Sequence, residues 1–126
     1  MLCNVCENIM KHFEIKLDEN NFKNRIMEYV HKNYLKDIDV YTMAHELGIS
    51  YSQLRRLFME YTGDNIVVYT NRLRTELAKR LLIETDKTIA EIAIETGYNN
   101  DQSLNRNFKK FEGLTPGEFR KKHYNL

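Results

Sequence analysis

Hydrophobic residues recur along most of the chain at the three- and four-residue spacing of amphipathic helices. Near the start of the chain, this spacing is followed by Phe22, Ile26, Tyr29 and Val30. In the middle of the chain, the expected apolar stripe of a long helix consists of Val67, Tyr69, Leu73, Leu77 and Leu81. No stretch alternates between apolar and polar residues for long enough to predict a strand. The pattern therefore predicts an all-α fold.

Polar capping residues and glycines mark where the predicted helices begin and end. The residues that can cap a helix N-terminus are Asp39, Ser50, Asn65, Thr88, Asn100 and Thr115. Three of them, Ser50, Thr88 and Thr115, are followed three residues later by Gln or Glu, which is the pattern of a capping box. The glycines that can end a helix are Gly48, Gly63, Gly97 and Gly113. These boundaries predict seven helices, over residues 21–34, 40–47, 51–62, 66–84, 89–96, 101–112 and 116–123.

One arrangement of small, apolar and basic residues occurs twice in the chain. The first copy consists of Ala44, Gly48, Leu54, Arg56, Phe58 and Gly63. The second copy consists of Ala93, Gly97, Leu104, Arg106, Phe108 and Gly113, with one extra residue after Gly97. The two alanines are 49 residues apart. An internal repeat of this length indicates that one supersecondary unit is built twice.

Each position of the repeat suits a helix-turn-helix unit. A small alanine lets two helices approach closely, and a glycine forms the short turn between them. A leucine and a phenylalanine four residues apart anchor the second helix by its buried face, so the arginine between them is exposed. We predict two such units, over about 40–63 and 89–113, joined by the long central helix. Their recognition helices would enter major-groove segments about 34 Å apart in B-DNA, and a shorter fixed spacing would require bent DNA.

Composition and charge add a mild bias toward an anionic partner. The net charge is only +1 and 42% of the residues are hydrophobic, enough for a core. Residues 1–50 carry six basic and eight acidic side chains, whereas residues 51–126 carry thirteen and ten. The basic residues near the end are Arg106, Lys109, Lys110, Arg120, Lys121 and Lys122. Alone, this excess would be better explained by a solvated helical face than by a nucleic-acid partner.

The sequence argues against several other classes of protein. It has no apolar run long enough to span a membrane and no signal peptide, so we expect a cytoplasmic protein. Cys3 and Cys6 form a pair without further cysteine ligands, so we expect incidental thiols and no metal or other cofactor. We find no nucleotide-binding glycine loop and no nucleophile–base spacing, so an enzyme is not expected. Residues 1–20 are predicted to be a leader or the remnant of a linker.

Residues 22–122 resemble the DNA-binding domain of the AraC/XylS family of transcription regulators. In the first unit the similarity lies in Ala44–Ser50, Leu54–Phe58 and Gly63, and in the central helix it lies in Arg72-Leu73, Ala78 and Leu81-Leu82. In the second unit it lies in Ile89–Ala93, Gly97-Tyr98, Arg106, Phe108–Lys110, Gly113, Thr115-Pro116 and Phe119-Arg120. The resemblance implies sequence-specific binding to double-stranded promoter DNA and recruitment of RNA polymerase, most often as an activator associated with the nucleoid.

The resemblance also implies which side chains contact DNA. The base-reading positions fall on Ser52, Arg55 and Arg56 in the first unit and on Gln102, Ser103, Asn105 and Arg106 in the second. Gln and Asn can bond adenine in a bidentate manner, and Arg prefers guanine. Lys109 and Lys110 are candidates for phosphate contacts. For the arginines, a surface salt bridge is the alternative to a DNA contact.

The chain departs from the family pattern at three neighbouring positions. Leu104 stands where phenylalanine is usual, and Asn100 replaces a frequent aspartate, although either can cap a helix. Asp101 adds a negative charge beside the expected groove.

Family members usually carry an effector or dimerisation domain before the DNA-binding part, so we expect this chain to be the DNA-binding fragment of a larger signal-sensing regulator. A small stand-alone member is the alternative. A helical adaptor that binds protein and has lost DNA binding is the competing function, against which Arg56 and Arg106 argue.

Overall fold

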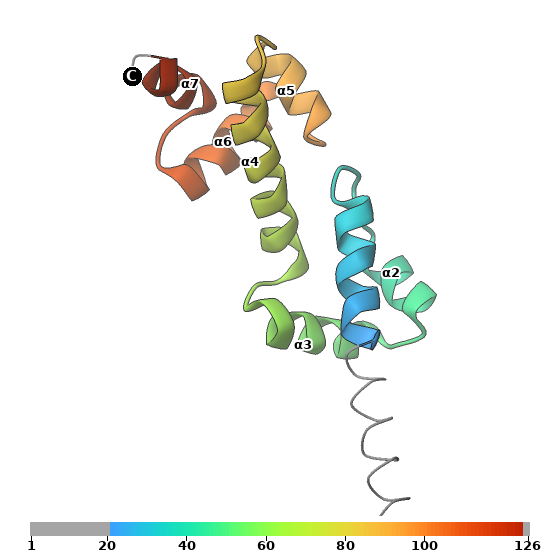
Figure 1. Ribbon diagram of the computed structural model, residues 1–126. Helices are drawn as coiled ribbons and strands as arrows, with labels where there is room; N and C mark the ends of the chain where they lie inside the picture. Colours follow the sequence, from blue (N-terminus) through green and yellow to red (C-terminus); the bar gives the residue numbers. More distant parts are fainter. Residues whose placement is uncertain (1–20, 125–126) are drawn as a thin grey trace, which may run out of the picture.

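The computed structural model describes residues 21–124, and this part of the chain consists of helices joined by short loops (Figure 1). The first helix is described over residues 21–33. The others are α2 (Val40–Leu47), α3 (Tyr51–Thr62), α4 (Ile66–Glu84), α5 (Ile89–Glu95), α6 (Asp101–Glu112) and α7 (Pro116–Tyr124). Between residues 21 and 124 there is no strand. The predicted all-α fold with seven helices is confirmed, and the helix ends differ from the prediction by one residue at most in this range.

The long helix α4 connects two groups of helices (Figure 1). The first helix, α2 and α3 lie toward one end of α4, and α5, α6 and α7 lie around the other. Each group encloses its own core. The first core contains Ile26, Val30, Met43, Ala44, Leu47, Leu54, Phe58 and Ile66. The second core contains Ala78, Leu82, Ile92, Ala93, Tyr98, Leu104, Phe108 and Phe119.

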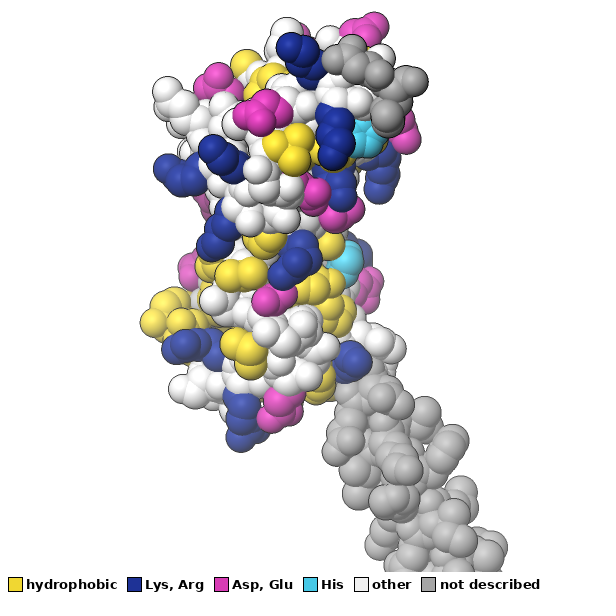
Figure 2. Space-filling model, turned by 90° about the vertical axis from the view of Figure 1, so that its left-hand side faces the viewer, with side chains coloured by type: hydrophobic (Ala, Val, Ile, Leu, Met, Phe, Trp, Pro, Cys, Tyr) yellow, Lys and Arg dark blue, Asp and Glu magenta, His cyan; other side chains and the backbone are white. Residues whose placement is uncertain are grey.

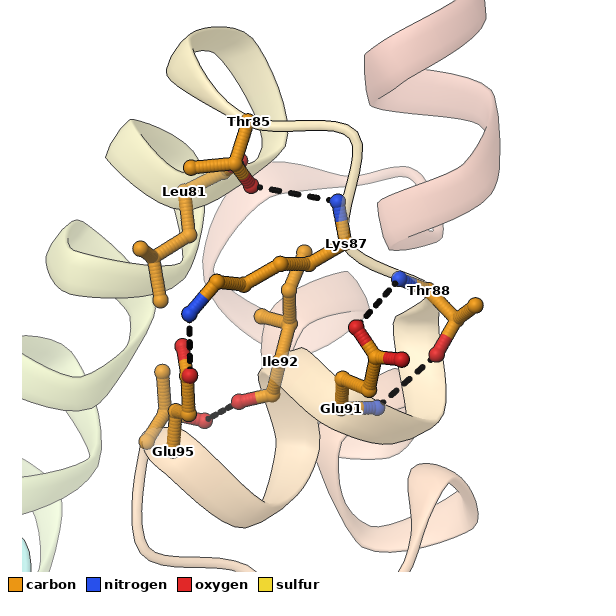
Figure 3. Close-up of polar contacts among 8 residues, drawn as sticks. Leu81, Thr85, Lys87, Thr88, Glu91, Ile92 and Glu95 are labelled. Atoms are coloured by element: carbon orange, nitrogen blue, oxygen red, sulfur yellow. Dashed lines mark hydrogen bonds and ion pairs between the residues drawn. The ribbon is translucent and has the colours of Figure 1, made fainter.

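Local capping contacts explain why the helices begin where they do. The Ser50 hydroxyl accepts from the Gln53 amide at 3.1 Å, and the Gln53 side chain accepts from the Ser50 amide at 3.1 Å. Thr88 and Glu91 make the same reciprocal pair before α5 (Figure 3). At Thr115 the hydroxyl accepts from the Glu118 amide but donates to the Glu118 carboxylate, so this cap is not a reciprocal box. Two predicted boxes are therefore present in full.

The buried face of α4 differs from the apolar stripe that the sequence predicts. Its buried residues are Ile66, Thr70, Arg74, Thr75, Ala78 and Leu82. Val67, which was assigned to the stripe, is 64% exposed. Tyr69 and Leu73 pack at the edge of the first core, and Leu81 packs at the edge of the second. The prediction was therefore wrong for Val67 only. An apolar stripe gives no sign of Thr70, Arg74 and Thr75, which are polar and buried.

Candidate nucleic-acid interface

The two predicted helix-turn-helix units have equivalent turns. In the first unit, the Gly48 amide donates to the carbonyl oxygen of His45 at 3.1 Å, and the Ile49 amide donates to that of Ala44 at 3.0 Å. In the second unit, the amide of Gly97 donates to Ile94 at 3.1 Å, and the amide of Tyr98 donates to Ala93 at 2.9 Å. The turn glycines have positive φ angles, 74° at Gly48 and 95° at Gly97, which favour glycine. The same backbone pattern thus follows α2 and α5.

Buried side chains fix the orientation of the second helix in each unit. Leu54 and Phe58 on α3 have no exposed surface, and the same is true of Leu104 and Phe108 on α6. The departure from the family at Leu104 therefore keeps a fully buried apolar side chain. Since residues three and four apart share one side of a helix, the face opposite these anchors is exposed on both α3 and α6.

The predicted base-reading residues lie mostly on these exposed faces. Ser52, Arg55 and Arg56 are all exposed and occupy one face of α3, because they are three and four residues apart. On α6, Gln102 and Arg106 are exposed. The side chains of Ser103 and Asn105 are half-buried, so α6 presents them less fully than the other predicted residues.

The exposed arginines of the two helices are not engaged in ion pairs. Within residues 21–124, the six ion pairs use Lys and Arg side chains other than Arg55, Arg56 and Arg106. The surface salt bridge that we considered for Arg56 and Arg106 is therefore not formed in this part of the chain. Both guanidinium groups keep their five donors for another partner.

An aromatic stack that the sequence analysis missed lies beside Arg55. The rings of Tyr41 on α2 and Tyr51 on α3 stack with centroids 4.4 Å apart and planes 14° apart. The guanidinium carbon of Arg55 lies 5.5 Å from the Tyr51 ring centroid, which is cation–π distance. The Arg55 guanidinium therefore lies beside the stack. Tyrosines at the first turns of α2 and α3 are the sequence feature that could have indicated it.

A shallow groove of about 570 Å³ runs along the exposed side of α3 and the start of α4. Its lining includes Tyr51, Ser52, Arg55, Arg56, Met59, Asn65, Ile66 and Val67. Three of the predicted base-reading residues thus border one concave surface. Its mixture of guanidinium, hydroxyl and apolar groups can contact phosphate, base edges and thymine methyl groups.

Basic side chains are distributed over both units. Figure 2 shows two lobes with a narrower waist, and Lys and Arg side chains on both lobes. Lys109 and Lys110 are exposed in the last turn of α6, where positive charges also interact favourably with the helix dipole. Asp101 lies in the first turn of α6, where a negative charge is favourable as well. These helix-end positions give the three charges a structural role even without DNA.

Two arginines serve the fold instead of a surface. Arg120 on α7 donates to the carbonyl oxygens of Leu82 at 3.0 Å, Thr85 at 3.1 Å and Lys87 at 2.6 Å. It was counted in the basic footprint of the sequence, but its guanidinium is occupied by the backbone at the end of α4. Arg74 on α4 has a comparable role at the end of the first helix. The role of Arg74 could not be predicted from the sequence, because its partners are backbone carbonyls far away in the chain.

The short connection between α4 and α5 is held by several polar contacts (Figure 3). Lys87 forms an ion pair with Glu95, and the Lys87 amide donates to the Thr85 hydroxyl at 3.3 Å. Together with Arg120, these contacts fix the start of the second unit relative to α4. They fix the direction in which the chain leaves α4 and enters α5, the first helix of the second unit.

The remaining predictions concern the leader, a metal site and a membrane span. Cys3, Cys6 and the leader over residues 1–20 lie outside the described residues. Within residues 21–124, no group of three His, Cys, Asp or Glu side chains is placed to hold a metal ion. None of the helices described there is long and apolar enough to span a lipid bilayer.

Comparison with known proteins shows related sequences and folds. The chain matches the helix-turn-helix domain family over residues 43–122. It is 31% identical over 100 residues to YtdP of Bacillus subtilis, an uncharacterized HTH-type transcriptional regulator, covering 79% of this chain and 13% of YtdP. It is 32% identical over 105 residues to AdaA of Bacillus subtilis, a bifunctional transcriptional activator and DNA repair enzyme, covering 83% of this chain and 50% of AdaA. The chain thus spans half or less of the length of these relatives.

A solved structure has the same arrangement of helices. The C-terminal domain of the two-component response regulator yesN from Fusobacterium nucleatum matches with a TM-score of 0.74 and 27% identity, over 79% of this chain and 98% of that domain. The two equivalent turns, the two exposed recognition helices and the long helix between them are thus found together with a family match over residues 43–122. The chain belongs to the AraC-type helix-turn-helix family of DNA-binding transcription regulators.

Proposed function

We propose that α3 and α6 of one chain bind two neighbouring major-groove segments of the same promoter. The observation that supports this most directly is the pair of equivalent turns, each followed by a helix with buried apolar anchors and exposed polar residues. A single helix-turn-helix usually needs a dimer to bind two half-sites. Two units on one chain let a monomer bind both.

The proposed base contacts differ between the two helices. On α3 they come from Ser52, Arg55 and Arg56, among which the two arginines favour guanine. On α6 they come from Gln102, Ser103, Asn105 and Arg106, among which the two amides favour adenine. Lys109 and Lys110 contact phosphates and set the register of α6 without selecting a base. Exposure and the absence of ion pairs at the arginines, within residues 21–124, support this assignment.

For the whole protein we propose a larger, signal-sensing regulator that activates transcription. In this proposal residues 1–20 belong to a leader or linker, residues 21–126 are the DNA-binding domain, and the effector or dimerisation domain lies outside this chain. RNA polymerase is the second partner, and the protein acts on the chromosome in the bacterial cytoplasm. The relatives support this, since AdaA is named a transcriptional activator and the chain covers 13% of YtdP. The role of the domain is binding without catalysis.

Selection of bound duplexes from a random DNA pool, at near-physiological salt, tests the proposal. We expect two short sequence blocks about one helical turn apart, both enriched together. The binding constant should also fall steeply as salt increases, because lysine and arginine contacts release counterions. Weak, strongly salt-dependent binding without any enriched sequence would contradict specific recognition by this chain.

A further inference from the structure

The group formed by the first helix, α2 and α3 touches the second helix-turn-helix unit at a place apart from the backbone of α4. The loop that follows the first helix approaches the turn after α5 from below in Figure 1. A Cβ atom added to Gly97 would lie only 2.8 Å from the Leu35 carbonyl oxygen and 3.0 Å from the Arg74 guanidinium. The contact therefore leaves no room for a side chain at the turn of the second unit.

Arg74 fills the space between the two units. Its side chain is buried, with 6% of the residue exposed. Nε donates to the Tyr34 carbonyl at 2.6 Å and Nη2 donates to the Lys36 carbonyl at 2.9 Å, both in the loop that joins the first helix to α2. On its other side, the guanidinium carbon lies 5.1 Å from the ring centroid of Tyr98, in the second unit.

Tyr98 completes the contact and ties it to α4. The residue is 8% exposed, and its hydroxyl donates to Oδ1 of Asn71 at 2.8 Å. Burial raises the pKa of Tyr98, and the charge of Arg74 lowers it to a smaller extent, so the phenol keeps its proton and remains a donor. Arg74, Gly97, Tyr98 and Asn71 together form what we call the inter-unit clamp.

The first core contains none of the clamp residues, and the second contains one of them. Of the four clamp residues, only Tyr98 belongs to a core cluster, and there it lies at 8% exposure beside fully buried side chains. Each core packs on its own part of α4, and a long helix can bend between them, so packing on α4 restrains the angle between the two groups less than a direct contact between them does. A second attachment beside the helix removes much of that freedom.

We propose that the inter-unit clamp fixes the distance and angle between α3 and α6, and so selects the spacing between the two DNA segments that bind at once. Its residues are positioning residues that touch neither base nor phosphate. The effect of the clamp on DNA spacing, the functional half of the proposal, rests on the proposed function. Its effect on the distance and angle between α3 and α6, the structural half, concerns the free protein and does not depend on DNA. A rigid connection between the two units gives high affinity for DNA at one spacing and low affinity at other spacings. A loose connection gives lower affinity over a wider range of spacings.

Three substitutions weaken the inter-unit clamp in different ways. Tyr98→Phe keeps the ring and removes only the hydroxyl bond to Asn71. Arg74→Met removes the charge and both carbonyl bonds. Gly97→Ala forces a Cβ against Leu35 at a φ of 95°. Arg80→Met is the matched control, because Arg80 is an exposed arginine on the same helix.

The structural half is tested without DNA by measuring the distance between the two units. Spin labels are placed at exposed Glu60 on α3 and Lys121 on α7, with Cys3 and Cys6 changed to serine, and distances are recorded by pulsed electron paramagnetic resonance. We expect one narrow distribution for the parent and for Arg80→Met, and a broader or shifted one for the three clamp variants. Circular dichroism identifies a variant that has lost its helices, and Tyr98→Phe remains informative if Arg74→Met does not fold.

The functional half uses duplexes that carry both selected sequence blocks with the spacer changed by one or two base pairs. For the parent, losing simultaneous engagement should weaken binding by about 100-fold, whereas the clamp variants should lose less than about tenfold. Unchanged distance distributions in all folded clamp variants would overturn the proposal, and so would broadened distributions with an unchanged spacing preference. If the parent selects no sequence blocks, the proposed function fails, and the distance measurement still decides the clamp.

Discussion

Arg56 and Arg106 occupy equivalent positions on α3 and α6, each between a fully buried leucine and a fully buried phenylalanine. Both are exposed, whereas Arg74 is buried and donates to backbone carbonyls. A buried guanidinium stabilises the loop that it binds, because it satisfies carbonyls that would otherwise lack donors. An exposed and unpaired guanidinium contributes little to folding and remains available for DNA.

Substituting Arg56 or Arg106 should therefore change base recognition and leave stability nearly unchanged. We expect Arg56→Ala and Arg106→Ala each to cost about 1–3 kcal/mol of binding free energy on the selected site. Repeating the random-pool selection should show relaxed preference in one sequence block only, a different block for each variant. If both variants retain the parent's preference, these two residues do not read bases.

Lys109 and Lys110 should behave differently from the arginines. Lys109→Ala should weaken binding by a similar factor on selected and unrelated duplexes, because a phosphate carries no sequence information. The slope of log binding constant against log salt should decrease in magnitude by about one. Lys122→Ala, which changes an exposed lysine on α7, is the control. A loss confined to the selected duplex would show that Lys109 contacts a base.

Arg120 should be required for folding and not for recognition. Arg120→Met removes the donors of three carbonyls at the end of α4, so we expect a loss of about 2–4 kcal/mol in the free energy of unfolding. Urea denaturation followed by circular dichroism measures it. Lys121→Met, at an exposed neighbouring position, should stay within about 0.5 kcal/mol of the parent. An equal, small effect of both variants would contradict the structural role of Arg120.

At the scale of helices, local contacts explain what the sequence could predict. Helix boundaries follow from capping side chains that act within three residues, so Ser50 and Thr88 could be placed from the sequence alone. The buried face of α4 could not be placed, because it depends on two cores built from distant helices. The partners of Arg74 are carbonyls of residues 34 and 36, and a backbone carbonyl gives no sequence signal.

The exposed faces of α3 and α6 were also predictable, since the repeat fixed which side of each helix is buried. How far each side chain on these faces is exposed was less predictable. Ser103 and Asn105 are half-buried, and the stack of Tyr41 and Tyr51 that lies beside Arg55 joins two different helices. Contacts between elements thus account for most of what the sequence missed in the candidate site.

The capping pair before α5 provides a test at the scale of one helix. Thr88→Ala removes the hydroxyl that accepts from the Glu91 amide, so the free energy of unfolding should fall by about 1 kcal/mol. Thr88→Ser retains that acceptor and should recover most of the loss. Chemical denaturation of the three proteins gives the comparison. An equal loss in the serine variant would mean that the methyl group, and not the cap, matters.

At the scale of the whole molecule, one long helix and two cores give a chain with two similar candidate DNA-binding surfaces. α4 separates the recognition helices, and the inter-unit clamp restrains the angle between them. Because the two units are covalently linked, binding of the first raises the effective concentration of the second at its own groove segment. In the proposed binding mode, the spacing between the bound segments is a property of this fold and not of a dimer interface.

We propose that one chain engages two DNA segments at once. Measurements of affinity and stoichiometry on three duplexes, in which both selected blocks are intact or either one is scrambled, test this proposal. We predict one protein per intact duplex and a loss of about 100-fold when either block is scrambled. Two proteins bound per intact duplex, or unchanged affinity after one block is scrambled, would contradict the claim.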